Sequence, residues 1–402
     1  MGQIQLQITG ESGSIFGANQ HYERTDSSPK GNGEGSFAFL DRSARPEFEV
    51  VRNFVEELLA QYPAKGIDEV VARLTRGNEV DFRSASFEVL IFNFLSRLGY
   101  TLEPHPELKN GSKKQPDFHV VASDGSEFLL EAVLSKEDKG ENLAVKAMMG
   151  TVMDKLNTRP HDNFRVTFST RGVPTTQPSG KKILHEVHTW LNTLDPDQIQ
   201  AEHHASFFAT APKREIPHED WTVSFQPIPI PREKRGTAKQ LIGLIDGGGG
   251  VVDSWTPLKE SLKEKGQRYG ELELPLLVAV NFSAFNLSDI DEMQALFGQE
   301  QFHFPVEGEG EPDFSRANNG LWIGPKGPQA TRVSGAWFFN DLSFHTAARR
   351  KGTLYFNPWS LYALPTNLDQ FPHARVCGDM KIERGGDVTI ADVFKLSSDW
   401  PN

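Results

Sequence analysis

A single glutamate inside an otherwise apolar stretch is the feature that most constrains how this chain folds. Glu131 lies between Phe128-Leu129-Leu130 and Ala132-Val133-Leu134, a run typical of a strand that is buried in a sheet. A buried carboxylate without a partner is strongly disfavoured. A metal ion shared with a second carboxylate would satisfy Glu131, and so would an ion pair with a lysine such as Lys146.

The turn before this strand predicts which residue lies opposite Glu131. If Ser123-Asp124-Gly125 forms a type I turn with Gly125 left-handed in a G1 bulge, Asp117 lies directly opposite Glu131. Directly opposed side chains share a sheet face, with Cβ atoms roughly 5 Å apart, which is within reach of one metal ion held by oxygen ligands. A two-residue turn would shift the register by one residue and place the two acids on opposite faces.

Hydrophobic spacing around this hairpin predicts a helix, three strands, a second helix and a fourth strand. The second helix would supply the crossover that a parallel fourth strand needs. We therefore expect an α/β core over residues 81–172, built from a helix at 84–98, strands at 101–104, 117–122 and 127–135, a helix at 142–156 and a strand at 164–169.

Glu88 is a third acid with an unusual position. It lies three residues before Ile91 and seven before Leu95, so it points along the apolar stripe of the first helix. A glutamate there needs a partner, and the proposed site offers one. It could equally be a residue at the boundary of that stripe.

Two acids that share a metal ion indicate phosphodiester hydrolysis, because a metal ion lowers the pKa of a bound water and stabilises charge on phosphate oxygens. Glu88, Pro116-Asp117 and Glu131-Ala132-Val133, in this order of elements, resemble the PD-(D/E)XK nuclease superfamily. A wider likeness to uncharacterised bacterial proteins with this core runs through Phe39–Pro46, Gly99-Tyr100, Pro104–Glu107, Asn281, Ala295–Gly298 and Asn357-Pro358-Trp359.

The resemblance implies a restriction-endonuclease-like core (α-β-β-β-α-β) and a nuclease that acts on DNA or RNA. Asp117 and Glu131 would hold Mg²⁺ or Mn²⁺, and Glu88 would assist through a second metal ion or an ordered water. The superfamily's lysine belongs two residues after the glutamate, where this chain has Val133. Candidate replacements remain open, and they are Lys113, Lys136 and Lys146. The predicted catalytic set is Glu88, Asp117, Glu131 and Lys146.

Two other interpretations compete with a nuclease. Without the lysine, the chain would be a catalytically silent nuclease-like module that binds nucleic acid or a protein. Alternatively, it is an unrelated α/β protein in which Glu131 pairs with a lysine.

The rest of the chain divides by pattern. We expect a flexible tail over 1–36, a helical lead-in over 37–80, an α/β extension over 173–299 and a strand- and loop-rich region over 300–402. The helix–strand passage at 257–282 could extend the sheet of the core or begin a second small domain.

Composition narrows the function further. The net charge of −12 argues against a simple nucleic-acid coating protein, although one local basic strip remains compatible with it. The single cysteine, Cys377, excludes an internal disulfide and favours a cytosolic, reducing location. No apolar run reaches the roughly 20 residues that span a bilayer, and we see no secretion signal.

Several conspicuous residues have ordinary explanations. We interpret Gly247–Gly250 as a loop, and His203-His204 lacks convincing metal-ligand spacing. His119 shares a face with Asp117, and we expect a core histidine rather than a residue that supports the metal site. The aromatic cluster is more typical of core packing than of base stacking, and comprises Trp337, Phe338, Phe339, Tyr355, Phe356 and Trp359.

Overall fold

The computed structural model describes residues 14–17, 23–136, 143–202, 211–246, 254–283, 287–303, 313–377 and 381–402. The chain forms two compact units: unit 1 comprises 1–28, 35–139 and 252–402, and unit 2 comprises 29–34 and 140–251. Unit 2 is thus largely an insertion in the chain of unit 1. The glycine run at 247–250, His203-His204 and half of the predicted tail (1–13 and 18–22) lie outside the described residues.

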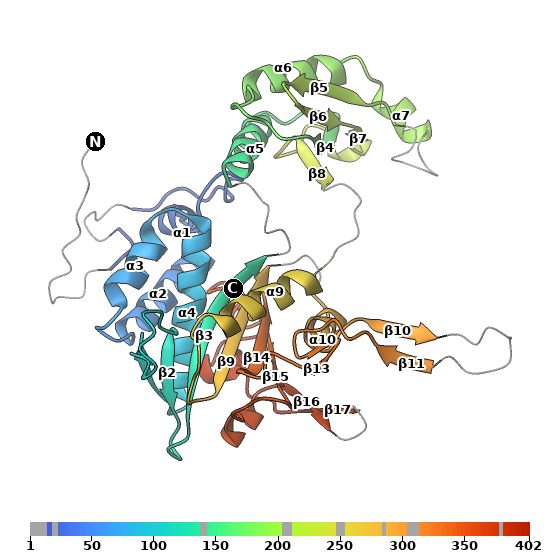
Figure 1. The fold of residues 1–402 in the computed structure, drawn as a ribbon. Coiled ribbons are helices and arrows are strands. Elements are labelled where there is room, and N and C mark those ends of the chain that lie inside the picture. The colour runs from blue at the N-terminus through green and yellow to red at the C-terminus, as the bar shows by residue number, and fades with distance from the viewer. Residues whose placement is uncertain are drawn as a thin grey trace. The chain divides into compact units, whose positions relative to one another are not determined.

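Unit 1 is built on one mixed sheet of eight strands (Figure 1). The order is β1-β2-β3-β9-β14-β15-β16-β17, in which β3, β9 and β14 are parallel neighbours. Their bounds are β1 Thr101–Pro104, β2 Phe118–Val121, β3 Glu127–Lys136, β9 Leu276–Ser283, β14 Val333–Asn340, β15 Gly352–Phe356, β16 His373–Cys377 and β17 Lys381–Gly385.

The crossover from β3 differs from the predicted one. The parallel neighbour of β3 is β9, reached through helix α9 (Trp255–Gln267), so the passage at 257–282 extends this sheet. The predicted fourth strand becomes β4 (Phe164–Arg171), which pairs with strands of unit 2, and the predicted crossover helix becomes α5 (Leu143–Asn157). Both passages have the same helix–strand periodicity, and periodicity does not report which strands pair.

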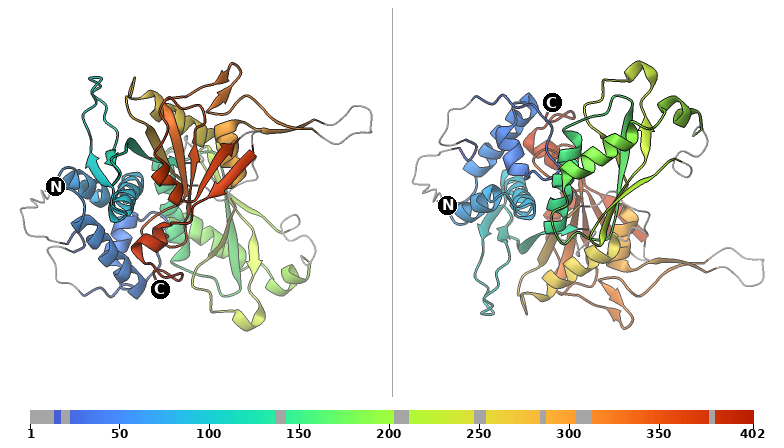
Figure 2. Two further views of the ribbon diagram at one scale, coloured as in Figure 1. Left: turned by 90° about the horizontal axis from the view of Figure 1, so that it is seen from below. Right: turned by 90° about the horizontal axis from the view of Figure 1, so that it is seen from above.

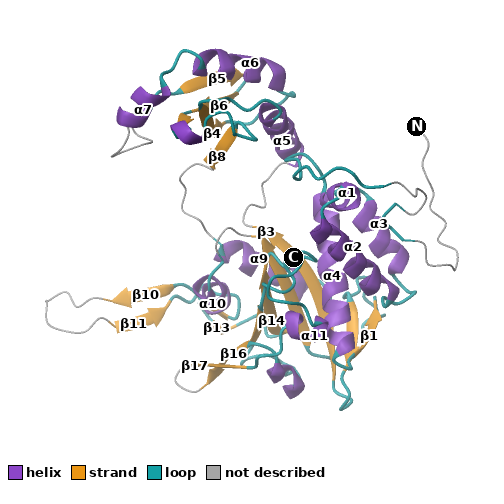
Figure 3. Ribbon diagram, turned by 180° about the vertical axis from the view of Figure 1, so that it is seen from behind, coloured by secondary structure: helices purple, strands orange, loops and turns teal. Residues whose placement is uncertain are grey.

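One face of the sheet is covered by the N-terminal helices (Figure 3). Apolar residues of α4, such as Phe87 and Leu90, pack with Phe118, Leu130 and Trp337 in a core that excludes water. Asn78 begins α4 by accepting a hydrogen bond from the Val80 N–H. The helices are α1 Ser36–Arg42, α2 Pro46–Ala60, α3 Ile67–Thr75 and α4 Glu79–Arg97, joined near the C-terminus by η2 Thr366–Gln370 and α11 Ile390–Phe394.

The other face carries α9 and α10 (Asp289–Phe297). Leu258 and Leu262 of α9 pack against Leu129 and Val133 of β3 and against Val278 of β9. Residues 129, 131 and 133 alternate toward this face while 128 and 130 face α4. Glu131 therefore points to the face that α9 covers.

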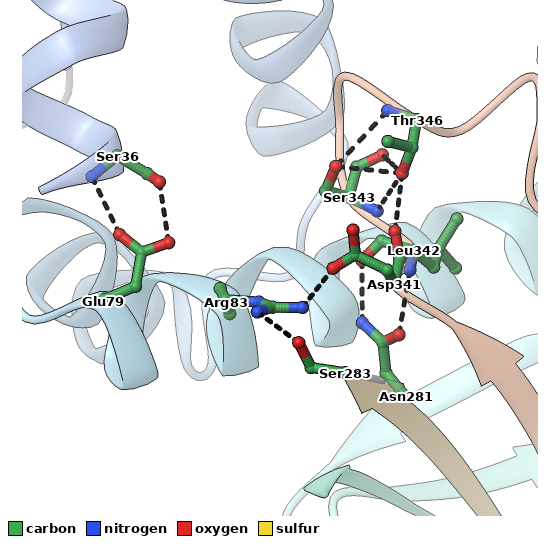
Figure 4. A network of polar contacts seen from close by, with 9 residues as sticks. All are labelled: Ser36, Glu79, Arg83, Asn281, Ser283, Asp341, Leu342, Ser343 and Thr346. Carbon is green, nitrogen blue, oxygen red and sulfur yellow. Dashed lines mark hydrogen bonds and ion pairs between the residues drawn. The ribbon is translucent and has the colours of Figure 1, made fainter. Parts of the chain in front are cut away.

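A polar network fixes α4 to the carboxyl ends of the central strands (Figure 4). Arg83 of α4 forms an ion pair with Asp341 after β14 and donates to Ser283 Oγ at the end of β9, at 2.9 Å. Nearer the start of α4, Glu79 accepts hydrogen bonds from the backbone and hydroxyl of Ser36. Asn281 is fully buried and bonds both the N–H and the carbonyl of Leu342. These contacts anchor the helix that carries Glu88.

Smaller elements complete unit 1. Strands β10 and β11 form an arm that extends away from the sheet (Figure 2). Their bounds are β10 Glu300–His303 and β11 Asp313–Arg316, and a second small pair consists of β12 Ile323–Gly324 and β13 Gly327–Pro328. Within the described part of the chain, no helix is both long and apolar enough to cross a membrane.

Unit 2 has its own sheet and its own core. Strands β5, β6, β4 and β7 pair in this order, and β8 joins β4 as a parallel neighbour. Val152, Phe164, Val187 and Trp221 are among its buried residues. Its remaining elements are α6 Gly180–Leu191, α7 Pro196–Glu202, β5 Arg214–His218, β6 Trp221–Phe225, β7 Pro227–Pro229, η1 Arg232–Lys234 and β8 Ile242–Asp246.

Candidate active site

The hairpin register is the one predicted from the turn. Gly125 has φ of 81° and donates to the Ala122 carbonyl, while the Ala122 N–H donates to Ser126. Phe118 pairs with Leu130 and Val121 with Glu127. Asp117 lies one residue beyond this pairing, where its carboxylate accepts a hydrogen bond from the N–H of Ala132, the residue after Glu131.

Glu131 has three basic or hydroxyl partners, all supplied by α9 and the residues that follow it. Its side chain is 2% exposed. Lys265 Nζ lies 2.6 Å from Oε1, the Tyr269 hydroxyl donates to Oε2, and Arg268 lies 3.6 Å from Oε1. Burial raises the pKa of Tyr269, and the nearby Glu131 charge raises it further. Tyr269 therefore remains a proton donor to the carboxylate.

Glu88 is equally buried and has its own partners on the α4 side. It forms an ion pair with Arg73 of α3 and accepts a hydrogen bond of 2.6 Å from Tyr62. The Glu88 charge raises the pKa of Arg73 against the opposing effect of burial. Glu88 is buried, and its partners are Arg73 of α3 and Tyr62, which follows α2.

Asp117 lies between these two groups. Burial raises the pKa of its carboxyl well above the ordinary value, and the Glu131 and Glu88 carboxylates raise it further. The Ala132 N–H, which lies beyond the part of β3 that β2 pairs with, donates to Oδ2 at 2.6 Å and opposes this rise together with Lys265. The Asp117 side chain thus takes up the first N–H of β3 beyond its pairing with β2. The charges of both Glu131 and Glu88 act on its carboxyl.

A lysine does accompany the acids, and it comes from α9 rather than from the hairpin or from α5. Lys265 on α9 contacts Glu131, whereas Lys113 is exposed in the loop before β2. Lys136 ends β3, and its side chain is outside what the structure describes. Lys146 is exposed on α5, which belongs to unit 2. Lys265 replaces Lys146 in the candidate set.

The sequence contains one weak indication that Lys265 has a partner, namely its helical spacing from Tyr269. Lys265 and Tyr269 are four residues apart, so they lie on one side of a helical turn, and a lysine beside apolar positions of a helix is ordinarily a solvated residue that covers them. Its role depends on α9 being the crossover after β3. With the crossover assigned to 142–156, Lys265 had no reason to be near Glu131.

Two other predictions concern neighbouring residues. His119 is partly exposed and lies 2.7 Å from Glu127 across the hairpin, so it is not a core histidine. The aromatic cluster is core packing as expected: Trp337 stacks on Phe371, and Phe338 contacts Tyr355 edge-on.

The donor set suits a hard cation held by few protein ligands. Within the described ranges, no three His, Cys, Asp or Glu side chains are grouped closely enough to form a complete metal site. Mg²⁺ is commonly bound through one or two carboxylates and several waters. Asp117 and Glu131 are the two carboxylates that could form such a pair, and added positive charge beside Asp117, whose pKa is raised, would favour its ionised form.

The fold and the site define a mixed α/β protein with an enclosed carboxylate–lysine centre at the β2–β3 hairpin. Comparisons with protein-family models, with curated proteins and with solved structures found no match. The function proposed below is therefore argued from the geometry of the site.

Proposed function

We propose that the chain is a metal-dependent nuclease that hydrolyses phosphodiester bonds of DNA or RNA, with Asp117, Glu131 and Lys265 as its catalytic residues. The observation that carries this proposal is the position of Lys265, whose Nζ lies 2.6 Å from Glu131 and whose charge also acts on the Asp117 carboxyl. Two carboxylates and a lysine are the side chains that the resemblance requires, and α9 supplies the lysine that Val133 does not.

The electrostatics support a cation at this position. Burial and two neighbouring carboxylates oppose the ionisation of Asp117. Its ionised form therefore needs more positive charge than its surroundings provide. Mg²⁺ or Mn²⁺ on Asp117 and Glu131 would supply that charge, activate a water molecule and polarise the phosphate.

The chain's own residues would do the rest. Tyr269 holds Glu131 in one orientation through its hydrogen bond. Lys265 brings a positive charge to where negative charge develops on the phosphate oxygens. Arg268, with 38% of its side chain exposed, can contact a neighbouring phosphate.

A catalytically inactive role is the second candidate, and one observation favours it. Lys265 and Tyr269 occupy both oxygens of Glu131, which already satisfies a buried carboxylate without any metal ion. In that case the centre would be a structural ion pair that holds α9 on the sheet.

Cleavage assays separate the two candidates. Labelled single- and double-stranded DNA and RNA are incubated with the purified protein and Mg²⁺ or Mn²⁺, beside Asp117→Asn, Glu131→Gln and Lys265→Met. Lys351→Met, which changes an exposed lysine of unit 1, is the matched control. A nuclease loses about 100-fold or more in rate with Lys265→Met, the scale for removing one charge-stabilising donor, and retains its rate with Lys351→Met.

Cleavage that survives Asp117→Asn and Glu131→Gln would come from a contaminant and would remove the support for this proposal. Metal uptake without cleavage of any substrate would favour the inactive module. A wild-type protein that neither takes up metal nor cleaves would leave the structural ion pair as the explanation.

A further inference from the structure

A pocket of about 510 Å³ lies on a different side of α9 from Glu131, entirely within unit 1. Lys259, Lys263 and Gln267 line it from α9 at helical spacing, and Arg332 lines it just before β14. Its size falls within the range of small-molecule sites. Lys265, on the neighbouring side of the same helix, faces the candidate active site.

The charge of this pocket is opposite to that of the protein. Its lining contains three cationic side chains and no carboxylate, although the chain has 54 acidic and 42 basic residues. Four amide side chains complete the polar part of the lining, and they are Gln267, Asn318, Asn319 and Gln329. Cations accompanied by amides form a surface that suits phosphate oxygens and the polar edges of bases.

Two of the cations are available to a ligand. Lys263 and Arg332 are exposed, and neither has an ion pair with any residue that the structure describes. Lys259 is held in place instead, because it lies over the Trp255 ring at 4.6 Å and donates to the Asn319 carbonyl at 3.2 Å. The pocket thus combines one fixed ammonium group with two that can move to a ligand.

We propose that this pocket binds the backbone phosphates of a nucleic-acid strand. The assignment deepens the proposed nuclease function and rests on it for the choice of a strand over a free phosphate. The cations come from two separate elements, α9 and the residues before β14, so they can contact successive phosphates. Because α9 also carries Lys265, a strand held here would be held by the helix that completes the candidate active site.

The test measures binding without cleavage. A fluorescein-labelled single-stranded oligonucleotide is titrated with the full-length protein in EDTA at several salt concentrations, with fluorescence anisotropy as the readout. The variant Lys263→Glu/Arg332→Glu is compared with Lys351→Glu/Arg76→Glu, which makes the same change in net charge at two exposed positions of unit 1 outside the pocket. All four positions are exposed, and thermal melts verify that each variant folds.

The pocket variant is expected to bind at least about 10-fold more weakly and to lower the slope of log affinity against log salt by about 1.4, or 0.7 for each lost phosphate contact. The control variant should change affinity less than about 2-fold, because net charge alone acts weakly at a distance in salt. Lys263→Arg should bind like the wild type.

Equal losses of affinity in the two double variants would overturn the proposal that this pocket binds the strand, since only net charge would then matter. Displacement of the oligonucleotide by pyrophosphate at the same total phosphate concentration would overturn the assignment to a strand. The binding result does not depend on cleavage. A wild type that binds as expected but never cleaves would contradict the proposed nuclease function and would leave strand binding by the pocket intact. Active cleavage with unchanged binding in the pocket variant contradicts the pocket alone.

Discussion

The candidate site depends on how the buried charge of Glu131 is satisfied. Its position in an apolar strand requires a partner, and the structure supplies Lys265 and Tyr269 rather than a residue of its own hairpin. The need for a partner could be predicted from the sequence because burial of the strand follows from local composition. The identity of the partner could not, because it lies 134 residues further along the chain.

Lys265→Met should destabilise the protein. The change leaves Glu131 buried with its main positive partner removed, which typically costs about 3 kcal/mol or more. Denaturant unfolding at pH 7 measures this loss, and Lys265→Met/Glu131→Leu should recover most of it because no uncompensated charge remains. A single variant as stable as the wild type would contradict the ion pair.

Asp117→Asn should stabilise the metal-free protein, increasingly so as the pH rises. The folded pKa of Asp117 is raised. The contribution of its carboxyl to stability is therefore fully present below the unfolded pKa of about 3.9 and is lost as pH rises through the folded pKa. Asparagine does not ionise and avoids that loss. Thermal melts in EDTA between pH 4 and pH 8 should show the two curves separating with pH. Parallel curves would mean that Asp117 is not held in an environment that opposes its charge.

At the scale of elements, the β2–β3 hairpin was predictable and the crossover was not. The turn Ser123-Asp124-Gly125 determines the register through local chemistry, since the left-handed conformation at Gly125 suits glycine. The pairing of β3 with β9 depends on contacts between distant segments. The register of the hairpin could therefore be predicted from local sequence, whereas the lysine that contacts Glu131 comes from α9, on the crossover.

Helix α9 sets the position of Lys265, and its packing on β14 can be tested. Gly266 is buried, and a Cβ added there would lie 2.4 Å from Val333 Cγ2. Gly266→Ala should cost about 1–3 kcal/mol through overpacking and should also weaken any activity that needs Lys265. Glu264→Ala, an exposed change on the same helix, should leave stability within about 0.5 kcal/mol of the wild type. Denaturant unfolding of both variants measures the difference, and equal effects would contradict close packing of α9 on β14.

At the scale of the whole molecule, one compact unit is inserted in the chain of the other. In unit 1, helix α4 and strands β1, β2 and β3 are followed, after the insertion, by helix α9 and by strand β9, which is parallel to β3. Residues 140–251 stand between its third strand and its second helix. This insertion has its own helix–strand passage, which is why hydrophobic periodicity could not identify the true crossover.

Unit 2 should fold without the rest of the chain. It has a separate core that includes Val152, Phe164, Val187 and Trp221, which is the property that defines an independent domain. The segment 140–251, expressed alone, should unfold in one cooperative thermal transition followed by tryptophan fluorescence. A gradual change without a transition would show that unit 2 depends on unit 1.

Metal binding tests the central claim most directly. Isothermal titration of Mn²⁺ into the wild type, in two buffers with different ionisation enthalpies, reports both the uptake of metal and the release of protons. A shared site on Asp117 and Glu131 predicts saturable uptake with proton release, because Asp117 must ionise to bind, and loss of that uptake in Asp117→Asn/Glu131→Gln. No uptake by the wild type, or the same uptake in the double variant, would contradict a metal-dependent active site at this hairpin.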